Sequence, residues 1–590
     1  MRRVDGADSS VGTAPHGSTC DRVVADLEAH LGDPHDDATV FSYARCAELD
    51  QTSSFPEAPY RQLDAWGLAR YYVPGVFGGA LDDYTVPTLL LAAVARRDLS
   101  VAVAHGKSFL GSVCAWVSPS RRSTDLAKLV LDGHPAAWGL TEPGHGSDLL
   151  AGELRADAVP GGYRLTGRKW PINNATRGRM ITLLARTEPT GGARGFDVFV
   201  VDKQDLDATA FQPLPKVSTH GIRGVDISGI AFDRAFVSEH TRLGDRGSGL
   251  ETVLKSLQLT RTLCSSLSLG AGAHALELGL DFAGDRHLYG RSLLELPRTR
   301  AVLADVCAEY LLVQALSLVG VRSIHTLTGE MSLTSAAIKY LAPTRTDRLI
   351  SNVGQVLGAR ALLVDGHACG QFEKLARDHR IVGIFDGNTH VNLHAIVNEL
   401  PTVARRAGRK PDADALTELF DLHRPVPAFD PQRLSLLSRT GSSVFAALPE
   451  LVRWLQSLGR HRPELAEATA LAERLRQHQD SFVTGLAGHR PARVVPAAAF
   501  RAAENFTWYL AGSAALGLWL GNHERHDTAP LWREGLWLRA VLRRVLTALG
   551  QPPPRSLTDD DTVLATVLDG HRYAAALSLL TSSPTQRGTR

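Results

Sequence analysis

The hydrophobic pattern of the chain changes twice, and these two changes constrain the fold more than any other sequence feature. Before residue 136 and after residue 244, apolar residues recur at intervals of three and four, as they do in helices. Between these positions, short β-type runs alternate with glycine and proline, as strands alternate with turns. We therefore expect a mainly α-helical protein that is interrupted by a central β-domain, a small barrel or sandwich of about 100 residues.

At 590 residues the chain is too long for one hydrophobic core and should fold as several domains. Long helical patterns after the β-domain predict a four-helix bundle, and a charged, proline-containing stretch after the bundle predicts a linker. In chain order, the expected parts are a flexible tail (1–18), an N-terminal helical domain (19–135), the β-domain (136–244), the bundle (245–404), the linker (405–430) and an appended helical domain (431–582).

Composition removes several classes of function. The 64 basic and 62 acidic residues balance to a formal net charge of +2, which gives no reason to expect nucleic acid as a partner. The six cysteines lie far apart without a CxxC pair, which excludes a zinc ribbon and a thioredoxin-type redox pair and indicates free thiols in a reducing compartment. The histidines lack metal-ligand spacing, so we expect no metal site.

Two further features bear on location. The N-terminus is polar after Arg2 and Arg3, so we expect no secretory signal and a cytoplasmic protein. The longest apolar run, residues 506–520, contains glycines and is shorter than the roughly 20 residues that span a bilayer. This run therefore predicts a buried helix.

Five motifs follow one another between residues 138 and 392. They are WGLTEPGHGSD at 138–148, LTGRKWPINNAT at 165–176, GDRHLYGRSLLELP at 284–297, NVGQVLGARAL at 352–362 and ARDHRIVGIFDGNTHVN at 376–392. In this order they resemble the motifs of the acyl-CoA dehydrogenases, a family of flavoproteins, and the resemblance covers roughly residues 30–400. The resemblance implies the domain order that the hydrophobic pattern predicts, with FAD as the cofactor.

The resemblance also implies which residues bind the flavin. The loop at 138–148 has hydroxyls and backbone N–H groups freed by glycine, which can bond the rim of an isoalloxazine without adding charge, although an ordinary hairpin turn would use the same residues. At 171 and 173 the family has a tryptophan and a threonine against the flavin, whereas this chain has proline and asparagine. The implied cofactor residues are Trp138, Leu140, Thr141, Gly146, Ser147, Trp170, Pro171, Asn173, Arg286, Gln355, Gly358 and Asn388.

Two of these residues imply a dimer. The guanidinium of Arg286 offers a fork of donors that suits a pyrophosphate, although a plain surface arginine is the alternative. In the family, the residues that match Arg286 and Gln355 reach the flavin diphosphate of the neighbouring subunit. The resemblance therefore implies a homodimer that completes each flavin site.

The catalytic assignment rests on Asp386 in the loop IFDGNTH at 384–390. The family usually has a glutamate at this position, and the resemblance implies that the carboxylate removes the α-proton of an acyl thioester while the β-hydride passes to flavin N5. Because an α-proton of this kind is weakly acidic, we expect an apolar, water-excluded site that strengthens the base. Aspartate is shorter than glutamate by one carbon–carbon bond, roughly 1.5 Å. The substitution therefore implies a shifted backbone, a different substrate or a weak enzyme, and an Asp-Gly turn without catalytic work is the alternative.

Substrate-binding residues are implied on the same grounds. Thr260 and Arg261 match the helix that lines the acyl pocket of the family, and Gly387 follows the catalytic carboxylate. Some members carry their base at the position of Thr260, but a threonine cannot act as a carboxylate base.

Three functions stay open at this point. The first is the α,β-dehydrogenation of an acyl thioester carried by CoA or by an acyl-carrier protein, with electron-transfer flavoprotein or O2 as the acceptor. The second is a flavin oxidase or oxygenase resembling nitroalkane oxidase, which uses an aspartate base and then reacts with O2. The third is a catalytically impaired subunit that depends on a partner.

The block beyond residue 430 resembles, in position and length, the helical extension of the very-long-chain acyl-CoA dehydrogenases. In that subgroup the extension replaces a second pair of subunits and helps to bind membrane. Residues 443–460 form an amphipathic pattern that suits a peripheral membrane contact. A helix packed between domains is the alternative, because Pro449 interrupts the pattern.

Overall fold

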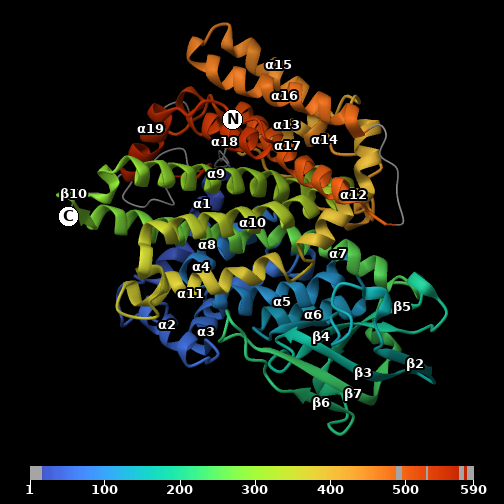
Figure 1. Ribbon diagram of the computed structural model, residues 1–590. Helices are drawn as coiled ribbons and strands as arrows, with labels where there is room; N and C mark the ends of the chain where they lie inside the picture. Colours follow the sequence, from blue (N-terminus) through green and yellow to red (C-terminus); the bar gives the residue numbers. More distant parts are fainter. Residues whose placement is uncertain (1–15, 487–493, 527–528, 570–576, 581–590) are drawn as a thin grey trace, which may run out of the picture.

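A computed structural model describes residues 16–486, 494–526, 529–569 and 577–580. The β-domain lies at one corner of the molecule, the helices of the bundle run across its middle, and the appended helices cover the side of the bundle that faces away from the β-domain (Figure 1). This is the mainly helical architecture with a central β-domain that the sequence predicts. Most of the expected tail lies outside the described residues, and the first helix begins at His16.

The N-terminal domain is built around one helix that is buried on every side. In this helix, α5 (Leu99–Val117), small and apolar residues predominate, so that neighbouring elements can approach it closely. It packs against the first strand of the β-domain and against the first helix of the bundle, and thus connects the three domains. The other helices of this domain are α1 (His16–Leu31), α2 (Tyr43–Gln51), α3 (Glu57–Trp66), α4 (Thr85–Arg97) and α6 (Arg121–Leu131).

The β-domain is one continuous sheet of eight strands with β6 and β8 at its ends. The strand order is β6-β7-β3-β2-β4-β5-β8, and β1 pairs in parallel with β4. Its buried face consists of aliphatic and aromatic side chains such as Leu165, Leu183 and Phe199. The strands are β1 (Ala136–Gly139), β2 (Arg155–Val159), β3 (Gly162–Asn173), β4 (Met180–Arg186), β5 (Phe196–Asp202), β6 (Phe211–Leu214), β7 (Ile227–Ser238) and β8 (Arg242–Leu243).

The helices of the bundle are long and mostly buried. Among the described helices, one is apolar and long enough to cross a membrane, but 89% of its most apolar stretch is buried inside the protein. This helix, α9, therefore belongs to the core, and its first residue is a proline, which suits a helix start. The helices are α7 (Gly249–Leu263), α8 (Ser265–Asp285), α9 (Pro297–Thr326), α10 (Met331–Leu357), α11 (Gln371–His379) and α12 (Thr389–Arg406).

The appended helices pack on α9 and α12. The expected buried helix at 506–520 is confirmed as the middle of α17, whose residues are buried throughout this stretch. The seven helices beyond residue 406 in the described chain are α13 (Ala413–Phe420), α14 (Ser443–Ala446), α15 (Leu448–Gly459), α16 (Ala466–Leu486), α17 (Ala497–Asn522), α18 (Leu536–Ala548) and α19 (Leu557–Leu568).

Two expectations about this region need correction. The predicted linker contains α13, which buries Leu416, Leu419 and Phe420. Buried Arg322 on α9 donates to the carbonyls of Leu419 and Asp421, and these bonds tie the segment to the bundle. Proline and charge are common in linkers, but they do not prevent a helix that is held by such a contact.

Pro449 does not interrupt a helix either. It occupies the first turn of α15, where its missing N–H costs nothing. The apolar side of α15 packs against α16 and α17, and among the apolar residues of this helix only Trp454 is exposed, at 45%. The packed alternative for residues 443–460 therefore describes this helix.

Candidate active site

Asp386 lies in the turn between α11 and α12, where the backbone is strained. Its φ of 56° is in the left-handed region, which non-glycine residues adopt rarely and often at functional sites. Gly387 follows at φ 102°, where a side chain would be unfavourable. Asn388 then begins α12, because its side chain accepts the backbone N–H of Val391 at 3.0 Å. The turn thus holds the carboxylate at the N-terminus of a helix.

The carboxylate of Asp386 is paired with an ammonium group. Lys107 Nζ on α5 lies 3.2 Å from Asp386 Oδ2, and the two side chains are only 9% and 12% exposed. The thiol of Cys264 donates to the same oxygen at 3.4 Å. Arg261 Nε on α7 donates to the backbone carbonyl of Asp386 at 2.9 Å and so fixes the turn. Polar contacts therefore replace the purely apolar surroundings that we expected for the base.

A second lysine, Lys339, shares an aromatic contact with Lys107. Lys107 Nζ lies 3.6 Å from the centre of the Phe385 ring and Lys339 Nζ lies 5.2 Å from it, so both ammonium groups contact an aromatic face. Lys339 also donates to the carbonyl of Val382 at 2.6 Å. Burial lowers the pKa of Lys339 to about 8 and the pKa of Arg261 to about 10, whereas burial raises the pKa of the Cys264 thiol to about 12.

Sequence reasoning missed Lys107, Cys264 and Lys339. Lys107 lies on α5, Cys264 at the junction of α7 and α8, and Lys339 on α10, and they are separated from one another by between 75 and 232 positions of the printed sequence. No local pattern singles out a lysine on a buried helix as the partner of a distant carboxylate. The one available signal is that Lys107 stands in an otherwise small and apolar helix, where a charge needs a partner.

A small cavity lies beside Lys107. It is lined mainly by apolar side chains of α4, α5, α7 and α8, among them Leu91, Leu110 and Leu267, and has a volume of about 30 Å³. Such a volume holds little more than one water molecule. Gly106 lies in the wall of this cavity, and any side chain at this position would narrow the cavity, since an added Cβ would lie 3.1 Å from Leu91. Lys107 and Cys264, the two side chains that contact Asp386, line this cavity, and its small size leaves no room for a long chain.

Thr260 lines the same cavity, but its hydroxyl is bonded within its own helix. Its side chain is fully buried and donates to the carbonyl of Leu257 within α7 at 3.4 Å. Of the predicted substrate residues, Gly387 belongs to the turn at 384–388, called the catalytic turn because Asp386 is its predicted base. Arg261 contacts this turn, and a Cβ added at Gly387 would lie 2.9 Å from the Arg261 guanidinium. The structure thus places Arg261 and Gly387 next to Asp386, and Thr260 on the wall of the neighbouring cavity.

The loop after β1 is fixed by a buried ion pair. Glu142 accepts from Lys169 Nζ at 2.7 Å and from the backbone N–H groups of Glu153 and Leu154. Burial alone would raise the pKa of Glu142, but Lys169 and the two N–H groups hold it below its usual value. Lys169 also donates to the carbonyl of Leu140 at 3.0 Å. This pair, which sequence reasoning missed, connects the 138–148 loop to β3.

The 138–148 loop and the end of β3 form an open wall beside the catalytic turn. The backbone N–H of Trp170 bonds the carbonyl of Thr141 at 2.9 Å. The side chain of Asn388, two residues after Asp386, donates to Ser147 Oγ at 3.4 Å. The predicted flavin residues that lie on this wall or next to it are Trp138, Leu140, Thr141, Gly146, Ser147, Trp170, Pro171, Asn173 and Asn388.

The residues of this wall fit a flavin. Gly144 and Gly146 have open space where a side chain would stand, so a planar ring can approach their backbone. The buried Asn173 Oδ1 has no hydrogen-bond partner in the described chain and can accept one from a ligand. Pro171 is exposed and Trp170 half-buried, so both can contact an isoalloxazine.

Arg286, Gln355 and Gly358 lie far from this wall. Arg286 follows α8, whose other end adjoins Cys264, and a helix of 21 residues is about 30 Å long. Arg286 and Gln355 are exposed, and Tyr289, at the turn of the β9 (His287–Leu288) and β10 (Arg291–Ser292) hairpin, is 94% exposed. The hairpin projects from the end of the bundle (Figure 1). These residues cannot reach the flavin wall of their own chain.

The chain is similar to known proteins in both sequence and fold. Residues 137–235 match the family model described as "Acyl-CoA dehydrogenase, middle domain", and residues 247–400 match "Acyl-CoA dehydrogenase, C-terminal domain". A probable acyl-CoA dehydrogenase, fadE25, of Mycobacterium leprae is 27% identical over 350 residues, which cover 58% of this chain and 87% of that protein. A cyclohex-1-ene-1-carbonyl-CoA dehydrogenase of Syntrophus aciditrophicus is 25% identical over 370 residues, which cover 59% and 83%.

Solved structures share the fold. An acyl-CoA dehydrogenase of Bacillus anthracis, complexed with FAD, has a TM-score of 0.67 at 17% identity and covers 96% of this chain and 97% of its own, appended helices included. The prolyl acyl-carrier-protein oxidase AnaB has a TM-score of 0.59 at 17% identity and covers 65% of this chain and 99% of its own. At such identities the likeness concerns the fold alone.

Proposed function

The chain belongs to the acyl-CoA dehydrogenase family through its middle and C-terminal domains, and from this premise we propose that it oxidises the α,β-bond of a short acyl thioester with Asp386 as the base. The enzyme is an FAD-dependent oxidoreductase, as its family implies. One observation carries the assignment of the base. The catalytic turn adjoins the flavin wall, because Asn388 of the turn donates to Ser147 of the wall. The carboxylate of Asp386 in the same turn faces Lys107, which lines the cavity.

In this proposal, the residues of the chain remove the α-proton of the thioester and hold the catalytic turn in position. Asp386 Oδ2 accepts the α-proton of the thioester, and Arg261 keeps the turn in place through the Asp386 carbonyl. Lys107 balances the charge of the carboxylate before the substrate binds, and its ammonium must move aside when the α-carbon approaches Oδ2. FAD, when bound, supplies the acceptor for the β-hydride.

The carrier and the acceptor belong to the same proposal. The acyl group is carried by CoA or by an acyl-carrier protein, and AnaB is a neighbour whose printed name states a carrier-protein substrate. Electrons then pass to an electron-transfer flavoprotein or to O2. We also propose a homodimer, which would bring Arg286, Gln355 and Gly358 of one subunit to the flavin of the other.

The proposal is tested by anaerobic reduction of the bound flavin in a stopped-flow spectrometer. Butyryl-CoA should bleach the wild-type flavin, and Asp386→Asn should slow this reduction by about 10²–10⁴-fold, the usual contribution of a positioned base. Asp365→Asn, an exposed acid in the segment before α11, is the matched control and should reduce at the wild-type rate. Reduction of Asp386→Asn at the wild-type rate would remove Asp386 as the base.

Two further readouts separate the other functions. Bleaching by nitroethane but not by butyryl-CoA would assign the chain to the oxidase chemistry of nitroalkanes. Purified protein that binds no FAD would indicate a catalytically impaired subunit. Mixing the reduced enzyme with O2, or with an electron-transfer flavoprotein, identifies the acceptor.

A further inference from the structure

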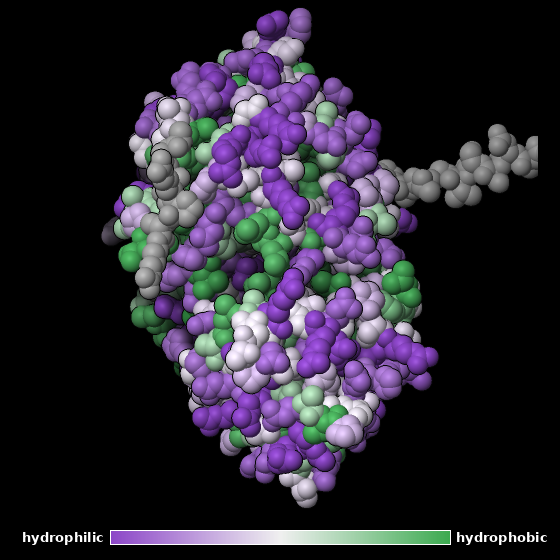
Figure 2. Space-filling model, turned by 90° about the vertical axis from the view of Figure 1, so that its right-hand side faces the viewer, coloured by the Kyte–Doolittle hydropathy of each residue, from purple (hydrophilic) through white to green (hydrophobic). Residues whose placement is uncertain are grey.

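A large basic groove lies between the bundle and the appended helices. It consists of a hollow of about 970 Å³ and a hollow of about 480 Å³ that share Arg406. α7, α12 and the segments 405–412 and 433–443 line it. The side of the molecule that carries these elements has a hollow near its middle, bordered by hydrophilic residues and a few hydrophobic ones (Figure 2). The basic groove is defined by its seven cations, Lys255, Arg405, Arg406, Arg409, Lys410, Arg433 and Arg439.

Six of these seven cations have no carboxylate partner in the part of the chain that the structure describes. Lys255 alone pairs with an acid of the groove, Glu251, at 2.8 Å. The other two acids are occupied: Glu330 accepts the N–H and hydroxyl of Ser443, and Asp412 caps α13 through the N–H of Asp414. The basic groove therefore carries a strong positive field, which attracts an anionic partner.

The basic groove runs along the two helices that also hold the catalytic turn. On α7, Lys255 stands six residues before Arg261, which is about 9 Å along a helix. On α12, Thr402 stands thirteen residues after Thr389, which is about 20 Å. A phosphopantetheine arm has the length of about five extended residues, roughly 17 Å. An arm attached beside Lys255, on the α7 side of the groove, is therefore long enough to bring its thioester to Asp386.

One buried side chain connects the two regions. Gln258, one turn before Arg261, is 3% exposed and donates from Nε2 to the carbonyl of Ser435, a residue of the groove wall, at 2.7 Å. Its Oε1 has no partner among the described residues. An unpaired buried acceptor is costly unless a ligand satisfies it. A pantetheine arm, which carries two amide N–H groups, would supply the missing donor.

We propose that the basic groove docks the acidic surface of an acyl-carrier protein, which delivers its thioester to Asp386 along α7. This inference rests on the proposed function and names the carrier. Exposed Leu436 and Leu437 lie within the cationic border and give the apolar centre that a docked protein needs. The cations spread over α7, the end of α12 and two segments of the extension, more widely than the few phosphates of one CoA would require.

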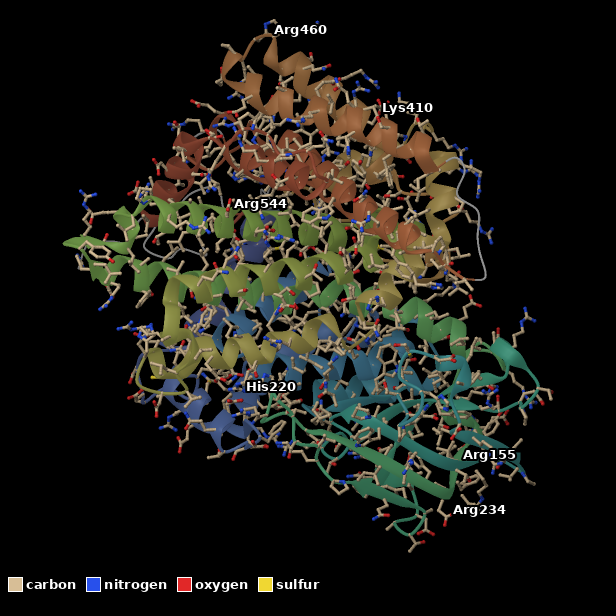
Figure 3. The ribbon with its side chains drawn as sticks, viewed as in Figure 1. Arg155, His220, Arg234, Lys410, Arg460 and Arg544 are labelled. Carbon is tan, nitrogen blue, oxygen red and sulfur yellow. The ribbon has the colours of Figure 1, made fainter. Side chains whose placement is uncertain are left out.

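The basic groove lies mostly outside the part of the chain that matches the family models. Six of its seven cations lie beyond residue 400, where the match to the C-terminal family model ends. Lys410 stands in the right-hand half of the molecule beside the extension, whereas Arg460 marks the far tip of the appended helices (Figure 3). The two arginines near that tip, Arg453 and Arg460, are exposed and therefore serve as a matched control.

The test is a binding titration with the full-length holoenzyme. The probe is a fluorescently labelled acyl-carrier protein with a butyryl-phosphopantetheine arm, followed by anisotropy. Wild type should bind it, and added salt should weaken the complex. The variants R409E/K410E and R439E should weaken binding about tenfold, because reversed charges repel the acidic surface. R453E/R460E should bind as wild type does. Absence of binding, or equal affinity of all variants, would overturn the proposal.

A kinetic comparison distinguishes the carrier from CoA. In the groove variants, kcat/KM for the carrier-borne butyryl group should fall about tenfold relative to kcat/KM for butyryl-CoA. An equal fall for both substrates would assign the groove to the phosphates of CoA and overturn the carrier proposal. If no thioester reduces the flavin while groove-dependent binding persists, the proposed dehydrogenase function fails and the docking surface stands.

Discussion

At the scale of single residues, the ion pair of Asp386 with Lys107 sets this active site apart from the apolar surroundings that the base chemistry would suggest. A carboxylate in a hydrophobic pocket gains basicity from desolvation, whereas one next to an ammonium is stabilised in its charged form. Lys339 and Arg261 add two more cations within the same region. The field at this site therefore favours negative charge, both on Asp386 and on a thioester that loses its α-proton.

Replacing Lys107 by methionine tests the role of this cation. Without the ammonium, the carboxylate loses the contact that holds it in place at 3.2 Å. We expect reduction of the flavin by butyryl-CoA to be about tenfold slower than in wild type. The control is Lys107→Arg, which keeps the charge and should keep the wild-type rate. A K107M rate equal to that of wild type would mean that Lys107 does not act on Asp386.

Glu399 predicts a pH dependence of stability. This residue of α12 accepts the N–H of Ser438 at 2.6 Å and the hydroxyl of Ser332 at 3.2 Å, and burial raises its pKa from 4.5 to about 7. Between these values the folded state binds more protons than the unfolded state, so the free energy of unfolding falls as the pH rises. Glu399→Gln keeps both contacts and removes the titration.

Urea unfolding measures this effect. Between pH 5 and pH 8, wild type should lose about 2 kcal/mol of stability relative to Glu399→Gln, after allowance for solvent screening. Parallel stability curves of the two proteins over this range would contradict the prediction.

At the scale of elements, one buried carboxylate joins the bundle to the appended helices. Glu309 on α9 is fully buried and accepts from Arg345 Nε of α10 at 2.9 Å and from Arg544 Nε of α18 at 3.0 Å. Burial alone would raise the pKa of Glu309, but the hydrogen bonds and charges of the two arginines hold it below its usual value. The interface between the domains thus depends on a charge cluster as well as on apolar packing.

Replacing Glu309 by glutamine should lower the free energy of unfolding by about 3 kcal/mol, because two buried guanidinium groups lose their counter-charge. The measurement is the urea midpoint, with limited proteolysis to show whether the appended helices loosen first. Asp305→Asn, one turn away, is the matched control, since Asp305 is 36% exposed and lies 3.7 Å from Arg544. Its effect should stay below about 1 kcal/mol. Equal effects of the two substitutions would show that burial of the cluster is unimportant.

At the scale of the whole molecule, the end of the bundle carries side chains that the monomer leaves uncovered. Tyr289 at the hairpin tip is 94% exposed, and Leu362, Leu363 and Val364 after α10 are exposed as well. Adjacent exposed apolar residues of this kind mark an interface. They lie with Arg286 and Gln355, which cannot reach the flavin wall of their own chain, and a second subunit would explain both facts.

Tyr289→Glu should therefore yield monomers of 63.6 kDa, where wild type is expected at twice that mass, about 127 kDa, in light scattering. The variant should also lose FAD on gel filtration, because each flavin site would lack the residues of the partner. Val76→Glu changes another apolar residue that is 87% exposed, on a short helical turn of the N-terminal domain, and should stay dimeric and hold FAD. A dimeric, flavin-replete Tyr289→Glu would exclude this hairpin from the interface.

The order of the domains could be predicted because each element type leaves its period in the sequence. The boundaries at 136 and 244 fall within two residues of the ends of β1 and β8, since strands and helices differ in hydrophobic period. The segment 405–430 could not be assigned in this way. Its charges and prolines are typical of a linker, and only the folded structure shows that it is packed, through the buried residues of α13 and the bonds of Arg322, about 100 residues away in sequence.

The sequence by itself determined the succession of helical, β and helical domains, the five ordered motifs and the presence of an acidic residue, Asp386, at the catalytic turn. Only the tertiary structure decided what surrounds that residue. Lys107 and Cys264 contact its carboxylate at 3.2 and 3.4 Å, and Lys339 contacts the neighbouring Phe385 ring. No local pattern records which distant helices will pack together. The basic groove has the same origin, because α7, α12 and the extension meet only in the folded chain.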